Sequence, residues 1–125
     1  MPNAVALFAG RPYRLPKAML ARHPELADAR WRRGGLPPKV GGWALGQRSV
    51  DGITLGRTVF LAPQAIPSAA LLLHELAHVH QFGRDAAFPF RYLWESLRRG
   101  YRRNRYEIEA NDYSASQLSR LHPGA

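Results

Sequence analysis

Two histidines four residues apart, with a glutamate directly after the first, form the pattern His74-Glu75-Leu76-Ala77-His78. On an α-helix, residues four apart lie on the same face, so both imidazoles can reach one metal ion. Glu75 lies about 100° further round the helix, where its carboxylate can face a metal-activated water without binding the metal. The pattern therefore predicts a zinc site with Glu75 as the general base of a hydrolytic reaction.

A chance pair of histidines on an ordinary helix is the alternative interpretation. With His74 at 0°, the helix has an apolar stripe between about 140° and 260°, on the side away from the histidines. The stripe consists of Leu72, Leu73, Leu76 and Val79. Because the histidines lie outside the stripe that must face the core, the metal site is the favoured interpretation.

Zinc needs a third protein ligand, and the sequence restricts where it comes from. The metzincin pattern requires a glycine at position 81 and a histidine at position 84, whereas this chain has Gln81 and Arg84. The remaining common ligand is a carboxylate from a later helix, for which Glu107 and Glu109 compete.

Helical periodicity separates the two glutamates. Within about 40° of Glu107 lie mostly apolar or small side chains together with an amide: Asn111, Ser114, Leu118 and Leu121. Glu109 instead shares a solvated face with Asp112, Ser116 and Arg120. We therefore predict Glu107 as the third zinc ligand. Asn111, one turn later, is either a hydrogen-bonding partner of a ligand or an ordinary surface amide.

Four other side chains are candidates for further roles at such a site. His80 projects about 200° away from His78, toward the apolar stripe, and is expected to be a core or interface histidine. Tyr101, Tyr106 and Tyr113 could each stabilise a tetrahedral oxyanion, because a phenol can donate a hydrogen bond to it. Each is more often a packing residue, so the choice among them stays open.

The elements before this pattern must place it against a sheet. Pro16 to Arg33 is expected to form one short helix, with Leu20, Leu26 and Trp31 as core anchors, followed by an irregular loop over residues 34–42. Residues 53–55 and 58–61 are expected to form strands around a two-residue turn. Glycine at the first turn position favours a type II′ hairpin, and Pro63 ends the second strand.

Three helices are expected in the second half of the chain. The first begins with Pro67 at its first helical position and runs to Phe82, with Gly83 after its end. The second covers residues 88–99, and the third covers residues 104–121 and is ended by Pro123. The order of elements predicts an α+β fold: a small domain with a short β-ribbon or sheet before the helix that carries the His-Glu-x-x-His (HExxH) pattern, and a C-terminal helix that carries the third ligand.

Length and composition favour one globular domain. A chain of 125 residues with 46% hydrophobic and 22% charged residues is expected to form a single domain over residues 1–125, in which 1–45 is an irregular or helical part and 46–125 is the catalytic core. No apolar run is long enough for a membrane helix, and no basic segment precedes the first short apolar run. The absence of cysteine excludes disulfides and thiolate ligands. A cytoplasmic location is the expectation, and the oligomeric state stays open.

The formal net charge of +9 comes mostly from arginine, since all but two of the 18 basic residues are arginines. Five of them form what we call the arginine cluster: Arg98, Arg99, Arg102, Arg103 and Arg105. A basic surface attracts polyanions, so weak binding of nucleic acid or another polyanion is expected. A solvated surface beside the site is the favoured interpretation, because charge alone does not indicate a specific partner.

Two stretches carry a resemblance to known families. The segment from Leu71 to Gln81 resembles the active-site helix of minimal bacterial gluzincin-type peptidases. The segment Glu107-Ile-Glu-Ala-Asn-Asp-Tyr resembles the ExxAN-aromatic motif of the ImmA/IrrE peptidases, which implies that Glu107 is the third zinc ligand. Residues 58–61, just before the helix, resemble the edge strand along which such enzymes lay an extended peptide substrate.

The strand and helix together are also similar to the short HExxH domains of contractile injection and polymorphic-toxin systems. The resemblance covers roughly residues 50–120, and residues 1–45 match no family. It implies a zincin-like fold and a zinc-dependent endopeptidase that acts on a peptide or a specific protein partner. The alternatives are a non-catalytic, zinc-stabilised binding or assembly module and a nucleic-acid-associated protease. A purely structural zinc site has no need of Glu75, which favours the enzyme.

Overall fold

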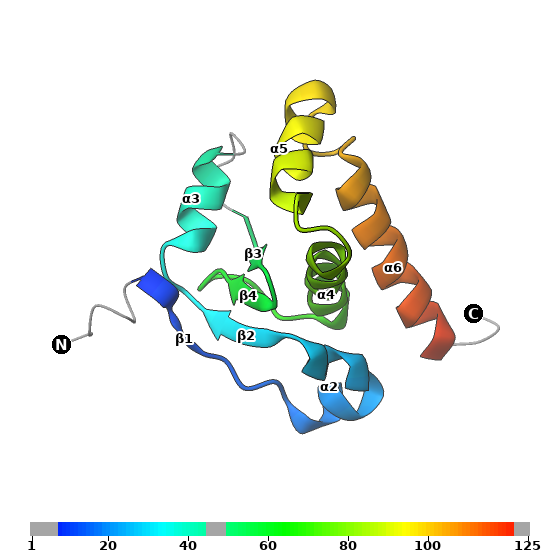
Figure 1. Ribbon diagram of the computed structural model, residues 1–125. Coiled ribbons are helices and arrows are strands. Elements are labelled where there is room, and N and C mark those ends of the chain that lie inside the picture. The colour runs from blue at the N-terminus through cyan, green and yellow to red at the C-terminus, as the bar shows by residue number, and fades with distance from the viewer. Residues whose placement is uncertain (1–7, 45–49, 122–125) are drawn as a thin grey trace.

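The structure is a computed structural model that describes residues 8–44 and 50–121 (Figure 1). Its fold is α+β, as the sequence predicts: a four-stranded mixed sheet is followed by helices. Figure 1 shows α4 (Ala69–Arg84) between the sheet and α6 (Arg105–Leu121), with α5 (Phe88–Arg99) above them. Within the described ranges, no helix is both long and apolar enough to cross a membrane.

The sheet has the strand order β1-β2-β4-β3. The strands are β1 (Arg11–Pro12), β2 (Arg30–Arg33), β3 (Gly52–Leu55) and β4 (Thr58–Leu61). β2 pairs in parallel with β4, and the other two pairings are antiparallel. The expectation that residues 58–61 form an edge strand is therefore wrong, because β2 covers the side of β4 that β3 leaves free. The edge strand next to the HExxH helix is β3.

The expectation of one helix over residues 16–33, and of an irregular or helical segment 1–45, is also wrong. This region contains α2 (Lys17–Arg22), a 3₁₀ turn η1 (Pro24–Asp28) and the strands β1 and β2. Pro24 has no N–H and disfavours a helical conformation at the residue before it, and His23 accordingly adopts φ −132° and ψ 73°. Two of the expected core anchors, Leu26 and Trp31, are buried, and Leu20 packs against the core from its margin.

Residues 34–42 were expected to be an irregular loop, but α3 (Pro37–Ala44) occupies most of this segment. Gly34 and Gly35 have φ values of 82° and 88°, which L-residues with a side chain rarely adopt. The two glycines make the sharp turn that connects β2 to α3, so only the turn itself is irregular.

The hairpin of β3 and β4 agrees with the sequence prediction. Leu55 pairs with Thr58, so the connection is the two-residue turn Gly56-Arg57. Gly56 has φ 65°, whereas none of the non-glycine residues in the described ranges has a positive φ. A positive φ at the first turn position alone is the pattern of a type II′ turn.

The three long helices also occur, two of them with corrected ends. α4 begins after Ser68, whose Oγ accepts a hydrogen bond from the N–H of Leu71 at 3.2 Å, so Pro67 lies before the cap and Gly83 lies inside the helix. α5 has the predicted bounds. α6 begins one residue later than predicted because Asn104 Oδ1 caps it, accepting from the N–H of Tyr106 at 2.9 Å. The predicted stop at Pro123 lies outside the described residues.

The apolar stripe of α4 determines how this helix is rotated. Leu72, Leu73 and Leu76 are fully buried and Val79 is 6% exposed, and all four belong to one core cluster with side chains of β2 and β4. Burying a leucine side chain stabilises a fold by about 1.5–3 kcal/mol. With the stripe held on the sheet, the histidine face of α4 turns toward α5 and α6.

Candidate metal centre

The three predicted ligands lie together. His74 and His78 on α4 and Glu107 on α6 offer ligand atoms that are all within 4.8 Å of one another. Nε2 of His74 is 3.1 Å from Oε2 of Glu107, and Nε2 of His78 is 2.7 Å from Oε1. Glu109, the competing carboxylate, is half-exposed and pairs with Arg84 and with the amide of Gln81, and it does not belong to the group of converging ligand atoms.

Small side chains on α6 allow Glu107 to approach the histidines. Ala110 is fully buried, and Ser114 donates a hydrogen bond from its Oγ to the carbonyl oxygen of Ala70 on α4 at 2.9 Å. These positions lie three and seven residues after Glu107, on the same face of the helix. The close contact of α4 with α6 therefore places Glu107 at the histidine face.

Two side-chain amides hold the far side of the imidazoles. Asn111 Oδ1 is 2.8 Å from Nδ1 of His74, and Gln81 Oε1 is 2.7 Å from Nδ1 of His78. An amide oxygen only accepts hydrogen bonds, so each Nδ1 carries a hydrogen. The Nε2 atom of each imidazole then faces the carboxylate of Glu107. Asn111 is thus the hydrogen-bonding partner of a histidine and not an ordinary surface amide.

Sequence reasoning missed the role of Gln81. In the sequence, its only use was to exclude the metzincin pattern. It lies three residues after His78 on the same helix face, which is a local signal for a hydrogen-bonding partner. Its Nε2 also donates to the carbonyl oxygen of Tyr106 at 3.0 Å, so this buried amide links α4 to α6.

The donor set requires a positive charge between its members. Two imidazole Nε2 atoms and a carboxylate converge, and without a proton or a cation their lone pairs would repel one another. Burial disfavours a charged imidazole, but the contact with Glu107 outweighs it and raises the pKa of His78 to about 9. Burial also opposes ionisation of Glu107, yet hydrogen bonds from His74 and His78 hold its pKa well below the usual range.

This arrangement suits a divalent metal ion. Two imidazoles and one carboxylate form a donor set typical of catalytic zinc, and imidazole also suits other transition metals. A metal ion would take the place of the proton that the three side chains otherwise share. His74, His78 and Glu107 are therefore residues that could hold a metal, whose identity the donor set alone does not decide.

Glu75 lies beside this group without belonging to it. Its side chain is buried, and Oε2 accepts a hydrogen bond from Thr54 Oγ1 on β3 at 3.1 Å. Gly52 makes room for it, because a Cβ at that position would lie 3.1 Å from Cδ of Glu75. Burial raises the pKa of Glu75, and the neighbouring His78 and His74 offset only part of this effect. A desolvated carboxylate of this kind is a good proton acceptor.

The tyrosines separate by position. Tyr101 lines the cleft at Glu75, whereas Tyr106 packs edge-on against Phe88 with a ring-centroid distance of 5.1 Å. Tyr113 lies against His80 at 5.7 Å, outside the metal-ligand group. Burial raises the pKa of Tyr101, and the adjacent Glu107 carboxylate raises it further, so its phenol stays protonated and able to donate.

Sequence reasoning also missed Tyr92, whose hydroxyl donates to Glu107 Oε1 at 3.0 Å. Its only signal is its place four residues after the buried Phe88, on the inner face of α5. The side chain of His80 is 40% exposed, and its Nε2 lies 3.7 Å from Oδ2 of Asp28. His80 is therefore an interface histidine between α4 and η1 and not a core residue.

Two cavities meet at Glu75. The first, of about 570 Å³, includes His74, Asn111, Ser114 and Asp51, and it is the more polar of the two. The second, of about 230 Å³, includes His78 and Glu107 and lies between β3 and α5. Both cavities share Val50, Gly52, Glu75 and Tyr101. A ligand could therefore pass from one cavity to the other across the histidine face.

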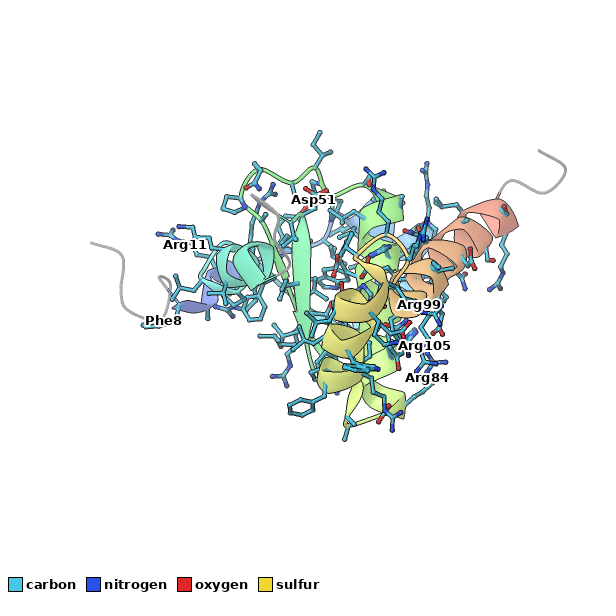
Figure 2. The ribbon with its side chains drawn as sticks, turned by 90° about the horizontal axis from the view of Figure 1, so that it is seen from above. Phe8, Arg11, Asp51, Arg84, Arg99 and Arg105 are labelled. Carbon is cyan, nitrogen blue, oxygen red and sulfur yellow. The ribbon has the colours of Figure 1, made fainter. Side chains whose placement is uncertain are left out.

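The arginine cluster surrounds the connection from α5 to α6. Figure 2 shows Arg99 and Arg105 on this side of the molecule, with Arg84 nearby. The Nε atoms of Arg99 and Arg105 lie 3.8 Å and 3.9 Å from Oε1 of the buried Glu95, so this carboxylate compensates part of the positive charge of the cluster. Arg98 lies over the ring of Trp94 at 5.9 Å. The predicted binding of polyanions stays a prediction.

Comparison with known proteins gives one family. A family model described as the eCIS core domain matches residues 23–86, just over half of the chain. The match runs from η1 to the end of α4 and includes the HExxH pattern, but it ends before Glu107. It agrees with the resemblance to domains of contractile injection systems, and it includes residues 23–45, for which the sequence indicated no family. Neither the curated proteins nor the solved structures gave a match.

Proposed function

The chain belongs to the eCIS core domain family, and we propose that it is a zinc endopeptidase that cleaves a peptide bond of a specific protein partner. One observation carries this proposal. The ligand atoms of His74, His78 and Glu107 converge, and beside them a buried carboxylate, Glu75, faces the cleft without joining the ligand group. This is the arrangement that metal-assisted hydrolysis needs.

The chain's own residues divide the work of the reaction. His74, His78 and Glu107 would hold zinc, and the amides on Nδ1 of the two imidazoles keep each Nε2 free for it. When bound, zinc would polarise a substrate carbonyl and make a water molecule more acidic. Glu75 takes the proton of that water as it attacks, and then gives it to the leaving amine. Thr54 holds the Glu75 carboxylate in place during both transfers.

Tyr101 is the tyrosine placed to stabilise the oxygen that gains negative charge. It lines both cavities at the point where they meet, and its raised pKa keeps the phenol proton available. A hydrogen bond that strengthens as charge develops lowers the barrier of the reaction. The hydroxyl of Tyr92 donates to Glu107 Oε1 at 3.0 Å and helps to orient that ligand.

The edge strand β3 offers a place for an extended peptide. In a two-residue hairpin the flanking pair Leu55 and Thr58 is hydrogen-bonded, and the bonded pairs then alternate along the strands. The backbone groups of Gly52 and Thr54 therefore point away from β4, toward the cleft. A substrate that pairs with them would extend the sheet and cross directly over Glu75, which touches both residues.

The non-catalytic alternative does not account for Glu75. A structural metal site gains nothing from an additional buried carboxylate, whose desolvation costs stability. The nucleic-acid-associated alternative rests on the arginine cluster alone, and two of its members lie close to the carboxylate of Glu95. Both alternatives therefore receive less support than the peptidase.

The test combines metal analysis with cleavage of a peptide library. We expect one zinc per chain in the wild type and in Glu75→Gln, and a loss of cleavage in Glu75→Gln of about 10²–10⁴-fold or more. Glu107→Gln should lose metal as well as activity. Glu109→Gln is the matched control on the same helix, and it should keep both. Equal turnover by Glu75→Gln and wild type on a verified substrate would refute the mechanism, and full zinc content in Glu107→Gln would refute the ligand set.

A further inference from the structure

The cavity between β3 and α5 differs in chemistry from the rest of the cleft. Its wall consists mainly of apolar and aromatic side chains: Ile53, Leu55, Phe82, Phe88, Pro89 and Leu93. We propose that this cavity is a specificity pocket that binds a large apolar side chain of the substrate, aromatic or leucine-like, next to the bond that is cleaved. The proposal rests on the proposed peptidase function and adds to it the class of residue that the enzyme selects.

The size of the cavity matches such a side chain. Its volume is about 230 Å³, and an apolar cavity of roughly 150 Å³ is already enough to bind benzene. A phenyl or isobutyl group therefore fits with space to spare, whereas a methyl group would leave most of the cavity unfilled. Unfilled apolar surface contributes no binding free energy, so alanine should be a poor occupant.

The position of the cavity places its occupant at the reacting bond. Glu75, His78 and Glu107 form part of its lining, together with Tyr92. A side chain that enters it must belong to a residue directly beside the scissile peptide, because its backbone would then lie over Glu75. On the other side of Glu75 the larger cavity is lined by Asp51, Asn111 and Ser114, so the two flanking residues of the substrate meet different surfaces.

The aromatic lining is held in a fixed arrangement. Phe88 contacts Phe82 with a centroid distance of 4.8 Å and Tyr92 at 5.7 Å, in inclined geometries that aromatic rings prefer. Phe88 is itself buried, at 5% exposed. A preformed apolar wall loses little entropy when a ligand binds, and it disfavours charged side chains because they would lose their hydration.

The rim of the cavity allows a controlled test. Leu93 on α5 lines the cavity and is 47% exposed, while Phe90 on the same helix is 76% exposed and does not line it. An aspartate at position 93 adds a charge to the mouth of the pocket, and an aspartate at position 90 adds the same charge to the same helix outside it. Because Leu93 is about half-exposed and Phe90 is largely exposed, both variants should fold, which far-UV circular dichroism would show.

The first measurement is cleavage of a peptide series by the zinc-loaded protein. The peptides differ only at one residue beside the cleavage site, which is phenylalanine, leucine, alanine, lysine or aspartate. We expect kcat/KM to be roughly 10- to 100-fold higher for phenylalanine and leucine than for alanine. Leu93→Asp should reduce this preference by a similar factor and favour lysine, whereas Phe90→Asp should keep the wild-type preference. Leu93→Trp, which fills the mouth, should reduce cleavage of the phenylalanine peptide.

The second measurement does not depend on catalysis. Ligand-observed NMR compares binding of N-acetyl-L-phenylalanine amide and N-acetyl-L-alanine amide to the zinc-loaded wild type. Binding of the phenylalanine amide but not of the alanine amide, lost in Leu93→Asp and kept in Phe90→Asp, supports the pocket. If this binding is seen but no peptide is cleaved, the peptidase proposal fails and the pocket remains supported. Cleavage without preference for a large apolar residue overturns the pocket and leaves the peptidase function intact. Equal binding of the two amides, or binding of neither, also overturns it.

Discussion

Replacing Gln81 tests the structure most directly, because this one buried amide supports both His78 and the packing of α4 against α6. Its Oε1 accepts from His78 Nδ1 at 2.7 Å, and its Nε2 donates to the carbonyl oxygen of Tyr106 at 3.0 Å and, at 3.3 Å, to Oε1 of Glu109. Gln81→Leu keeps a side chain of similar size but removes all three hydrogen bonds. The imidazole N–H of His78 would then be buried without an acceptor.

The expected loss follows mainly from the two shorter bonds, to His78 and to Tyr106. With a pKa of about 9, His78 is charged at neutral pH in the metal-free protein. A hydrogen bond to a charged group contributes about 1.5–3 kcal/mol, and one between neutral groups about 0.5–1.5 kcal/mol. We therefore expect Gln81→Leu to lower the free energy of unfolding of the metal-free protein by about 2–4 kcal/mol. Because Nδ1 no longer has a partner, affinity for zinc should fall by roughly 10- to 100-fold.

Two further variants separate these effects. Gln81→Glu keeps an acceptor for His78 but cannot donate to Tyr106, so zinc affinity should hold while stability still falls. Gln117→Leu on α6 is the control, because its amide accepts an exposed hydrogen bond from Arg120, and it should stay within about 0.5 kcal/mol of wild type. Urea unfolding measures stability, and competition with a chromophoric chelator measures zinc affinity. Wild-type zinc affinity in Gln81→Leu, or equal losses in Gln81→Leu and Gln81→Glu, would refute this reasoning.

Three other perturbations have defined outcomes. Zinc must displace the proton that His78 keeps up to a pKa of about 9, so zinc affinity should rise by about tenfold per pH unit through neutral pH and level off near that pH. Calorimetry in buffers of different ionisation enthalpy would reveal the released proton. A constant zinc affinity between about pH 6 and 8 would contradict this prediction. Gly52→Ala places a Cβ 3.1 Å from Cδ of Glu75. It should lower kcat by up to about tenfold at unchanged zinc content, since a 1 Å displacement of a catalytic group lowers the rate by roughly a hundredfold. An unchanged kcat would show that Glu75 can shift freely. The arginine cluster should bind polyanions weakly and in a strongly salt-dependent manner. Charge reversal of Arg102 and Arg103 should abolish this binding in filter assays and selectively lower cleavage of acidic peptides. Binding that survives high salt would point to a specific nucleic-acid site instead.

The sequence determined those features that depend on a single helix. The apolar stripe of α4, the shared face of His74 and His78, and the choice of Glu107 over Glu109 all follow from a period of about 3.6 residues. The hairpin followed from the position of Gly56, because few residues accept a positive φ there. Such features are local, so periodicity and turn chemistry are enough to predict them.

Tertiary structure decided everything that depends on which elements meet. The pairing of β2 with β4 joins residues nearly thirty positions apart, and it makes β3 the edge strand. Helical periodicity shows that a face is buried but not what covers it, so it could not indicate that Tyr92 from α5 reaches Glu107, or that Gln81 reaches the backbone of α6. The choice of Tyr101 as the tyrosine in the cleft depends on the same packing. Contacts of this kind arise only when the elements close around one core, because side chains from distant segments then compete for the same small space.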